Sequence, residues 1–466
     1  MNLVIHGNTP FAWVAAIQMA AFGNQVTLCP SWSVLVSDPD DELLREPGLA
    51  MLRQEQLRAG RLRLACGMDF TLPETATPDQ FWIAHDASLQ RLNKECEALL
   101  NAAFVRADVD ELPAFCVLSP FPVGTLSRLQ TYLHQIADYM RQQARADQRP
   151  VPERPPLVCA LPLFVRAGSL LSDFNQPQLL LIGCDDALQG SGLLENLRPI
   201  ARRAHEVMIV PLAAAELIKS SVNAMLATRM SFMNEIASLC ERLDIDVELV
   251  RQGMAADPRI GSDYLQPGCG FGGPSFSSEL LSFARTMKST LDRESLIETA
   301  ISVNERQREL LFRKLWRHFE GRLEGRCFAI WGAAYKPGSA SVQDSAVHPL
   351  LHALWAQGAR TRVYDPLAGS SLAEHYPDQP LLTVVAQPYD AVRGCPDGAA
   401  ASDAASEGAD ALILVTACEE FQSPDFALLT AALKQPLIFD GRNVYDPEYL
   451  ADIGITYVGI GRGTVV

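Results

Sequence analysis

Residues 1–29 read MNLVIHGNTPFAWVAAIQMAAFGNQVTLC. The pattern predicts an apolar strand at 3–5, a turn at 7–10, a helix at 11–22 and a second strand at 25–29. A strand, a helix and a second strand in this order are typical of the βαβ unit that begins a doubly wound parallel sheet.

Further apolar runs at 81–84, 115–118 and 179–182 alternate with helical segments and continue this sheet. A second βαβ pattern begins at 327–332, and between the two patterns the segments 213–243 and 280–319 are predicted to be helical, without strands. We therefore predict an α/β protein with two Rossmann-like, doubly wound parallel sheets joined by a central helical domain. The expected domains are a degenerate dinucleotide-binding fold at 1–198, a helical dimerisation domain at 199–310 and an α/β domain at 311–466.

The composition narrows the classes of function. A net charge of −16 disfavours nucleic acid and anionic membranes as partners, and an anionic ligand would need a local cluster of Lys and Arg. No run of eighteen apolar residues and no signal-peptide pattern occurs, so we expect a cytoplasmic protein. The eleven cysteines form no C-x-x-C pair and no metal-ligand spacing, which predicts reduced, mostly buried thiols and no metal site.

Residues 267–276 read PGCGFGGPSF, a glycine-rich loop. This loop resembles the nucleophile loop of the UDP-glucose/GDP-mannose dehydrogenase family, the nucleotide-sugar 6-dehydrogenases. Further landmarks of that family are similar at 119–125, 215–223, 257–261, 332–337 and 440–443. The resemblance implies oxidation of the C6 hydroxyl of a nucleotide-linked sugar to a carboxylate, with two NAD molecules used in succession, by a dimer or a larger oligomer.

The resemblance assigns four positions near the reacting carbon. Ser275 stands where the family has its nucleophilic cysteine, and Glu279 stands at the family's aspartate. Lys219 and Asn223 keep the positions that polarise the sugar C6 oxygen, and their spacing of four places them on one helix face. A serine hydroxyl is far less acidic than a thiol and needs an adjacent base to become a nucleophile.

Other catalytic groups of the family are replaced. Leu163 and Ala167 stand where the family has two glutamates, and Pro120 replaces the threonine that positions the catalytic water. Neither leucine nor alanine can accept a proton. Cys269 is predicted to be a small packed side chain and not a substitute nucleophile.

The cofactor loop also departs from its pattern. A dinucleotide fold has G-x-G-x-x-G, whereas this chain has Gly7, Thr9 and Ala12 at the three glycine positions. Pro30 replaces the acidic residue expected to hold the adenosine ribose, while Thr125 keeps its place in the family's G-T pair. The family implies NAD as cofactor, and these departures predict that NAD binds weakly or not at all.

The residues at the nucleotide-sugar positions are better preserved. By resemblance, Arg259 reaches the sugar of the neighbouring subunit, Gly272 lets the loop fold tightly under the sugar, and Lys336 and Arg442 contact the uridine-phosphate end. One lysine or arginine alone would be an ordinary surface cation. Several cations at matching landmarks favour a cleft for a phosphorylated ligand.

The leading hypothesis is a nucleotide-sugar dehydrogenase homologue that binds a UDP-sugar or related nucleotide with little or no dehydrogenase activity. The alternative is an active NAD-dependent UDP-glucose 6-dehydrogenase that produces UDP-glucuronate. A third hypothesis is a one-step oxidation or a hydrolysis through Ser275, ranked last because no His–carboxylate pair is evident near that serine. We expect a homodimer through the apolar helix at 213–243. The apolar surface of this helix is supplied by Met225, Leu226, Met230, Phe232 and Met233. An active homologue is a further candidate partner.

Overall fold

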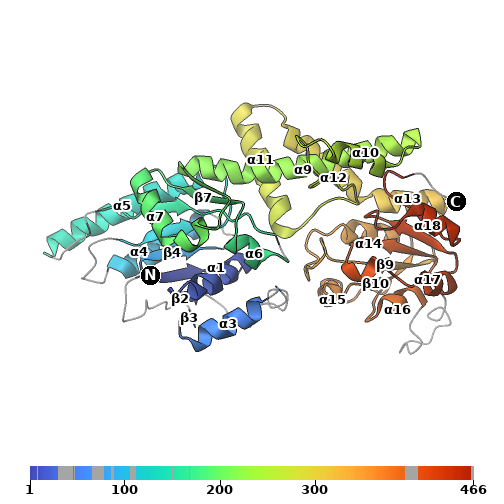
Figure 1. The fold of residues 1–466 in the computed structure, drawn as a ribbon, viewed down its shortest axis with the longest axis horizontal. Coiled ribbons are helices and arrows are strands. Elements are labelled where there is room, and N and C mark those ends of the chain that lie inside the picture. Colours follow the sequence, from blue (N-terminus) through green and yellow to red (C-terminus); the bar gives the residue numbers. More distant parts are fainter. Residues whose placement is uncertain are drawn as a thin grey trace. The chain divides into compact units, whose positions relative to one another are not determined.

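The computed structural model describes residues 1–462 except residues 8, 30–45, 47, 66–77, 85–88, 105–111, 149–151, 153, 167 and 394–407. Pro30 and Ala167, which carried two of the predictions, lie outside the described residues. Contacts divide the chain into two compact units, Met1–Ser221 and Val222–Val466 (Figure 1). Each unit has a sheet of its own.

The described residues of the N-terminal unit form an eight-stranded sheet of order β3-β2-β1-β4-β5-β6-β7-β8. Neighbouring strands are parallel except β6 and β7, which meet antiparallel at Ala160 and Gly183. The strands are β1 (Asn2–His6), β2 (Gln25–Cys29), β3 (Leu62–Leu64), β4 (Gln80–Ile83), β5 (Ala114–Val117), β6 (Val158–Ala160), β7 (Leu179–Gly183) and β8 (Glu206–Val210). The helices are α1 (Pro10–Ala21), α3 (Leu49–Arg58), α4 (Leu89–Phe104), α5 (Thr125–Ala146), α6 (Leu170–Asn175), α7 (Ala187–Asn196) and α8 (Arg198–Ala201).

Helix α1 is the buried helix of this unit. Every residue from Ala12 to Ala20 is buried, including the polar Gln18. A helix that is apolar on all sides packs in the interior, and α1 lies between the sheet and the helices α3 and α6. This burial fixes the start of α1 at the carboxyl end of β1, where a dinucleotide fold binds its ligand.

The described residues of the C-terminal unit form a six-stranded parallel sheet of order β11-β10-β9-β12-β13-β14. In chain order this is 3-2-1-4-5-6, the arrangement of a dinucleotide-binding fold. The strands are β9 (Cys327–Trp331), β10 (Arg360–Tyr364), β11 (Leu382–Val384), β12 (Ala411–Leu414), β13 (Leu437–Asp440) and β14 (Thr456–Val458). The helices that pack with this sheet are α13 (Leu310–His318), α14 (Val347–Ala356), α15 (Gly369–His375), α16 (Pro388–Arg393), α17 (Phe426–Ala432) and α18 (Pro447–Asp452), with a 3-10 turn η2 (Glu419–Phe421).

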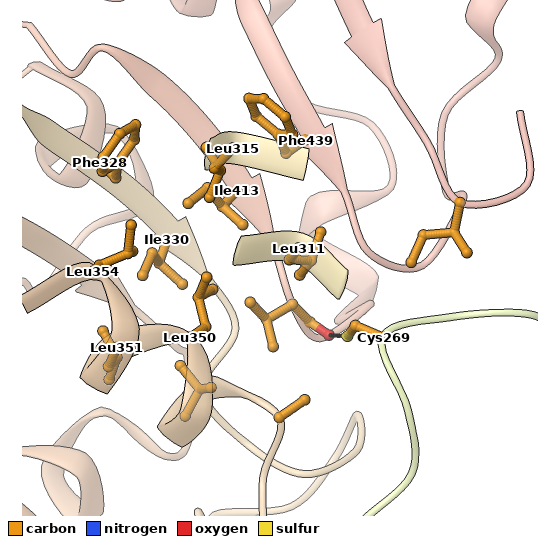
Figure 2. Close-up of a cluster of buried hydrophobic side chains, with 14 of the residues drawn as sticks. Cys269, Leu311, Leu315, Phe328, Ile330, Leu350, Leu351, Leu354, Ile413 and Phe439 are labelled. Atoms are coloured by element: carbon orange, nitrogen blue, oxygen red, sulfur yellow. Dashed lines mark hydrogen bonds between the residues drawn. The ribbon is translucent and has the colours of Figure 1, made fainter. Parts of the chain in front are cut away.

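Alternate side chains of β9 enter two different cores. Phe328 and Ile330 pack with leucines of α13 and α14, as Figure 2 shows. Ala329 and Trp331 face the opposite layer, which is formed by α16, α17 and α18. A strand buried on both faces is apolar at every position, as the run at 327–331 is.

The helical middle contains α9 (Leu212–Leu243), α10 (Val247–Ala255), α11 (Pro274–Leu291) and α12 (Leu296–Arg308). The predicted fold class, two Rossmann-like sheets with a helical middle, is confirmed. The division at 198 and 310 remains a proposal, and because β8 pairs with β7, the first boundary would have to move past β8 to keep the sheet whole.

Two expectations drawn from the composition can be compared with the described residues. All nine described cysteines are free and buried, as predicted for packed thiols. In the same part of the chain, no helix has the length and apolarity needed to cross a membrane, and no group of three or more His, Cys, Asp or Glu side chains is arranged to hold a metal ion.

Candidate functional site

The glycine-rich loop is shaped by close backbone contacts within the C-terminal unit. A Cβ atom added at Gly272 would lie 1.8 Å from the carbonyl oxygen of Asp344, and one at Gly273 would lie 2.7 Å from the ring of Tyr335. Gly273 has a φ of +108°, which L side chains rarely adopt. The glycines are therefore required by the approach of the segment 335–344, in addition to any ligand.

Buried amide side chains hold this loop in place. Asn304 binds Phe271 twice, accepting from its N–H at 2.8 Å and donating to its carbonyl oxygen at 3.0 Å. Asn234 accepts from the Gly268 N–H at 2.9 Å, and Gln307 donates to the Gly268 carbonyl oxygen at 2.7 Å. Fixed polar contacts of this kind give the loop one conformation.

Ser275 is the second residue of α11, directly after the glycine loop. Its backbone carbonyl accepts from the Ser278 hydroxyl at 2.9 Å. Among the described residues, no base accepts a hydrogen bond from the Ser275 hydroxyl. The serine therefore has its predicted position in the chain but lacks the partner that would make it a nucleophile.

Cys269 lies within the hydrophobic core and not at an open surface. Its thiol is fully buried and contacts the Val415 carbonyl oxygen at 3.5 Å, the contact drawn in Figure 2. Burial raises the pKa of the Cys269 thiol, which disfavours the reactive thiolate. The predicted packing role of Cys269 is confirmed.

Asn223 and Glu279 meet between α9 and α11. The Asn223 side-chain amide donates to a Glu279 carboxylate oxygen at 2.5 Å. Both side chains are half-buried and lie close in sequence to Lys219 and Ser275, respectively. Glu279 thus holds the Asn223 side-chain amide in one orientation.

Lys336 and Arg442 follow two strands of the C-terminal sheet at its carboxyl edge, after β9 and β13. Lys336 Nζ lies 5.5 Å from the centre of the Tyr335 ring. Arg442 donates from Nε to the Val415 carbonyl at 2.7 Å and from Nη1 to the Gly270 carbonyl at 3.2 Å. Arg442 therefore joins the sheet edge to the glycine loop, and its cationic fork lies at the edge where such sheets bind ligands.

Two buried aspartates at this edge were given no role from the sequence, although Asp440 begins the landmark at 440–443. Asp365, after β10, accepts from the amides of Ala333 and Ala334 at 2.7 and 3.0 Å. Asp440, at the end of β13, accepts from the Arg442 amide at 2.8 Å, and burial raises the pKa of its carboxyl group. A carboxylate at the end of a strand is the signal that could have marked both as loop anchors.

Arg259 lies at the surface, with 87% of its side chain exposed. It forms a bidentate ion pair with Asp257, with its shortest distance, 2.6 Å, between Nη2 and Oδ2. The pair lowers the pKa of Asp257. The predicted role of Arg259 toward a neighbouring subunit remains a prediction.

In the N-terminal unit, Thr9 caps the first turn of α1. Its hydroxyl accepts from the Ala12 N–H at 3.2 Å and donates to the Ala84 carbonyl oxygen at 2.7 Å. Pro10, the next residue, has no N–H group. The helix end where a dinucleotide's pyrophosphate would bind therefore has one amide occupied by Thr9 and another removed by Pro10.

Gly7 is fixed by the neighbouring strand, since a Cβ atom there would lie 2.1 Å from the Ala84 carbonyl oxygen. Ala12 is fully buried and belongs to the core. Of the three fingerprint positions, only Gly7 thus keeps the glycine geometry. Among the described residues at the start of α1, two of the three fingerprint glycines are therefore absent, and the Ala12 amide is already bound by the Thr9 hydroxyl.

Thr125 begins α5, and its side chain is buried. The carboxylate of Glu216 on α9 caps this helix, accepting from the amides of Gly124 at 2.6 Å and Leu126 at 2.9 Å. Burial raises the pKa of Glu216, and these amides offset part of the rise. Glu216 belongs to the family landmark at 215–223, but its cap could not be predicted because Gly124 lies far from it in the chain.

Lys219 is held by the segment that carries the replaced glutamates. Its Nζ donates to the Leu163 carbonyl oxygen at 3.0 Å and lies 4.9 Å from the centre of the Phe164 ring. At Leu163 the backbone supplies an acceptor, but the side chain supplies no carboxylate. Lys219 thus keeps the lysine of the family motif, whereas Leu163 has no carboxylate in place of the motif's glutamate.

Comparisons with known proteins agree with the family resemblance of the landmark motifs. Residues 213–306 match the central domain of the UDP-glucose/GDP-mannose dehydrogenase family, and residues 329–447 match its UDP binding domain. The chain is 32% identical over 476 residues to the UDP-glucose 6-dehydrogenase of Pseudomonas aeruginosa, covering 99% of this chain and 98% of that protein. It is 30% identical over 422 residues to the UDP-glucose 6-dehydrogenase of Rhizobium meliloti, covering 90% and 89%.

A solved structure shares the fold. The UDP-glucose dehydrogenase from Pyrobaculum islandicum superposes with a TM-score of 0.79 at 24% identity, covering 99% of this chain and 98% of that chain. The landmark motifs, the two Rossmann-like sheets and the near full-length relatives all lead to one assignment. The chain belongs to the UDP-glucose/GDP-mannose dehydrogenase family.

Proposed function

We propose that this chain binds a UDP-sugar or a related nucleotide and has lost most or all of the family's dehydrogenase activity. The observation that carries the proposal is the Thr9 cap of α1. Its hydroxyl takes the Ala12 amide, and its methyl group adds bulk where the second fingerprint glycine lets pyrophosphate approach. We infer that NAD, the family cofactor, binds weakly or not at all.

The residues of the reaction centre support the same conclusion. Oxidation of an alcohol to a carboxylate needs a covalent or hydrated aldehyde intermediate and groups that move protons. Ser275 has no base within hydrogen-bond distance among the described residues, and Leu163 and Pro120 supply neither a carboxylate nor a water anchor. Catalytic groups that act together are strongly non-additive, so their combined loss removes more than any single one.

The C-terminal unit supports retained nucleotide binding. Lys336 and Arg442 stand at the carboxyl edge of the sheet within the segment that matches the UDP binding domain. In a protein of net charge −16, a diphosphate needs such local cations to overcome the surrounding field. The role that follows is that of a binding, regulatory or assembly partner, alone as a homodimer or together with an active homologue.

An active NAD-dependent UDP-glucose 6-dehydrogenase is the second candidate. It is favoured by the relatives named UDP-glucose 6-dehydrogenase and by the Asn223–Glu279 contact, which joins two of the positions assigned near the reacting carbon. The two candidates differ in whether NADH is formed when UDP-glucose and NAD are both supplied.

Ser275→Cys alone is expected not to restore turnover. The new thiol would still lack proton-transfer partners and a positioned water, so restoring one member of the group should recover little. The assay is NADH formation from UDP-glucose and NAD by the wild-type protein and the variant, with retained UDP binding as the control for folding. NADH formation by the variant would refute the proposed loss, and NADH formation by the wild-type protein would establish the second candidate.

The dimer proposal rests on an exposed apolar stripe of α9. Met225, Phe232 and Leu239 follow one another at intervals of seven residues, and their side chains are 62%, 48% and 51% exposed. A seven-residue repeat places side chains on one helix face, as in paired helices. Of the predicted apolar set, Met233 is instead fully buried in the core of the C-terminal unit.

Phe232→Glu is therefore expected to dissociate the dimer, because a charge in the centre of an apolar interface costs roughly 2 kcal/mol or more. Light scattering at micromolar concentration measures the mass. The matched control is Leu188→Glu, at an exposed leucine of α7, which should leave the mass unchanged. A wild-type monomer at this concentration would show that the stripe does not pair.

A further inference from the structure

A second concentration of positive charge lies in the C-terminal unit, in a cavity between α9, α12 and α13. The cavity has a volume of about 590 Å³ and contains five cationic side chains and two carboxylates. The cations are Arg242, Arg306, Arg313, Lys314 and Arg317, and the acids are Glu235 and Glu241. This α9–α12–α13 cavity is separate from the sheet edge that carries Lys336 and Arg442.

One of the two acids is already engaged. Glu241 forms an ion pair with Lys314 and accepts from the Gly461 N–H at 2.9 Å. This pair joins α9 to α13 and the C-terminal segment, so it has a structural role. The other charged residues of the cavity are four arginines and Glu235. Together they leave the cavity with an excess of three positive charges.

The four arginines have no carboxylate partner among the described residues. The hydrogen bond described for Arg313 goes to a neutral group, the Arg306 carbonyl oxygen, at 2.7 Å. Some arginines elsewhere in the described chain do pair with acids, as Arg251 does with Glu248 and Arg259 does with Asp257. Like charges gathered on one face repel one another, and an anionic ligand bound among the four arginines would relieve that repulsion.

The positions of the four arginines on three helices bring their side chains to one cavity. Arg313 and Arg317 are four residues apart on α13 and therefore share one face, and Arg306 lies in the last turn of α12, just before α13 begins. Arg242 faces them from the last turn of α9. Guanidinium groups converging from three helices suit phosphate oxygens, which accept paired N–H donors.

The wall of the cavity also touches the glycine-rich loop. Asn234 and Gln307 line the cavity, and the same two side chains bind the N–H and the carbonyl oxygen of Gly268. A ligand that orders this wall would therefore act on the residues that hold the loop before Ser275.

We propose that the α9–α12–α13 cavity binds a polyphosphate-type anion with three or more negative charges, as an effector site distinct from the nucleotide-sugar site. Its volume lies within the range of about 300–1,000 Å³ that is usual for small-molecule sites. Its lining is charged and carries no aromatic ring among the described residues, so the ligand is recognised through its phosphates. The proposal does not depend on whether dehydrogenase activity is retained.

The test is calorimetry of the full chain with inorganic tripolyphosphate, in the presence of saturating UDP. We expect saturable binding of one tripolyphosphate per chain. The double variant Arg242→Gln/Arg317→Gln should weaken this binding at least ~10-fold, as expected for lost charged hydrogen bonds. Both side chains are exposed, and thermal unfolding checks that the variant is folded.

The matched control is Arg285→Gln/Arg293→Gln, which removes the same charge from two exposed arginines outside the cavity. An equal loss of tripolyphosphate affinity in both variants would show that the overall charge of the protein, and not the cavity, determines binding. That result would overturn the proposal. So would the absence of saturable binding, its removal by UDP, or unchanged binding in the cavity variant. If the cavity variant changes only the mass measured by light scattering, the cavity belongs to a contact between two copies of the chain, which also overturns it.

Discussion

Gly272→Ala is expected to destabilise the C-terminal unit by about 3 kcal/mol, the upper part of the usual range for overpacking. The added Cβ atom would lie 1.8 Å from the Asp344 carbonyl oxygen, and backbone atoms cannot rotate away as the end of a side chain can. Asp344 is itself restrained, because its carboxylate pairs with Arg308 at 2.8 Å and accepts from the Ser277 hydroxyl. Equilibrium unfolding in urea measures the loss.

Gly253→Ala is the matched control for this substitution. Gly253 lies inside α10, and a Cβ atom there meets no neighbouring atom within 4 Å. Alanine favours a helix by up to about 1 kcal/mol over glycine, so this variant should be more stable than the wild-type protein. Equal stability of the two variants would contradict the packing described for the glycine loop.

Lys336→Met is expected to weaken UDP binding by ~10- to 100-fold, since a charged hydrogen bond contributes roughly 1.5–3 kcal/mol. Methionine keeps an extended side chain that can still pack on Tyr335 but removes the ammonium group. Lys336 is a cleaner choice than Arg442, because Arg442 also binds Val415 and Gly270 and its loss would disturb the loop.

The control is Lys288→Met, the same exchange at an exposed lysine of α11 that pairs with Glu298. Calorimetry with UDP should give wild-type affinity for this variant. Unchanged affinity in Lys336→Met would remove Lys336 from the proposed nucleotide site.

The long, apolar strands at the centre of each sheet were predicted from the sequence. The runs at 81–84 and 327–331 are buried on both faces, so their hydrophobicity alone marks them. The three-residue strands β3, β6 and β11 were missed, because so short a run shows no clear periodicity, although the equally short edge strand β14 was predicted from its residues 456–458. The strand β8 was missed although it has five residues, since it leads directly into the long helix α9.

The candidate site was predicted where its residues are neighbours in the chain. Lys219, Asn223 and Ser275 were assigned through the family resemblance of the short motifs that contain them, and the spacing of four placed Lys219 and Asn223 on one helix face. The contacts that determine what these residues can do are tertiary. The Thr9 bond to Ala84, the Glu216 cap on α5 and the clamp of Asn304 on Phe271 each join segments that only the fold brings together.

The central claim, nucleotide-sugar binding without cofactor binding, is tested most directly by calorimetric titration of the wild-type protein with UDP-glucose and, separately, with NAD. The claim predicts saturable binding of UDP-glucose and no saturable binding of NAD in the low micromolar range. Saturable NAD binding in that range would contradict it, because the Thr9 cap would then not exclude the pyrophosphate.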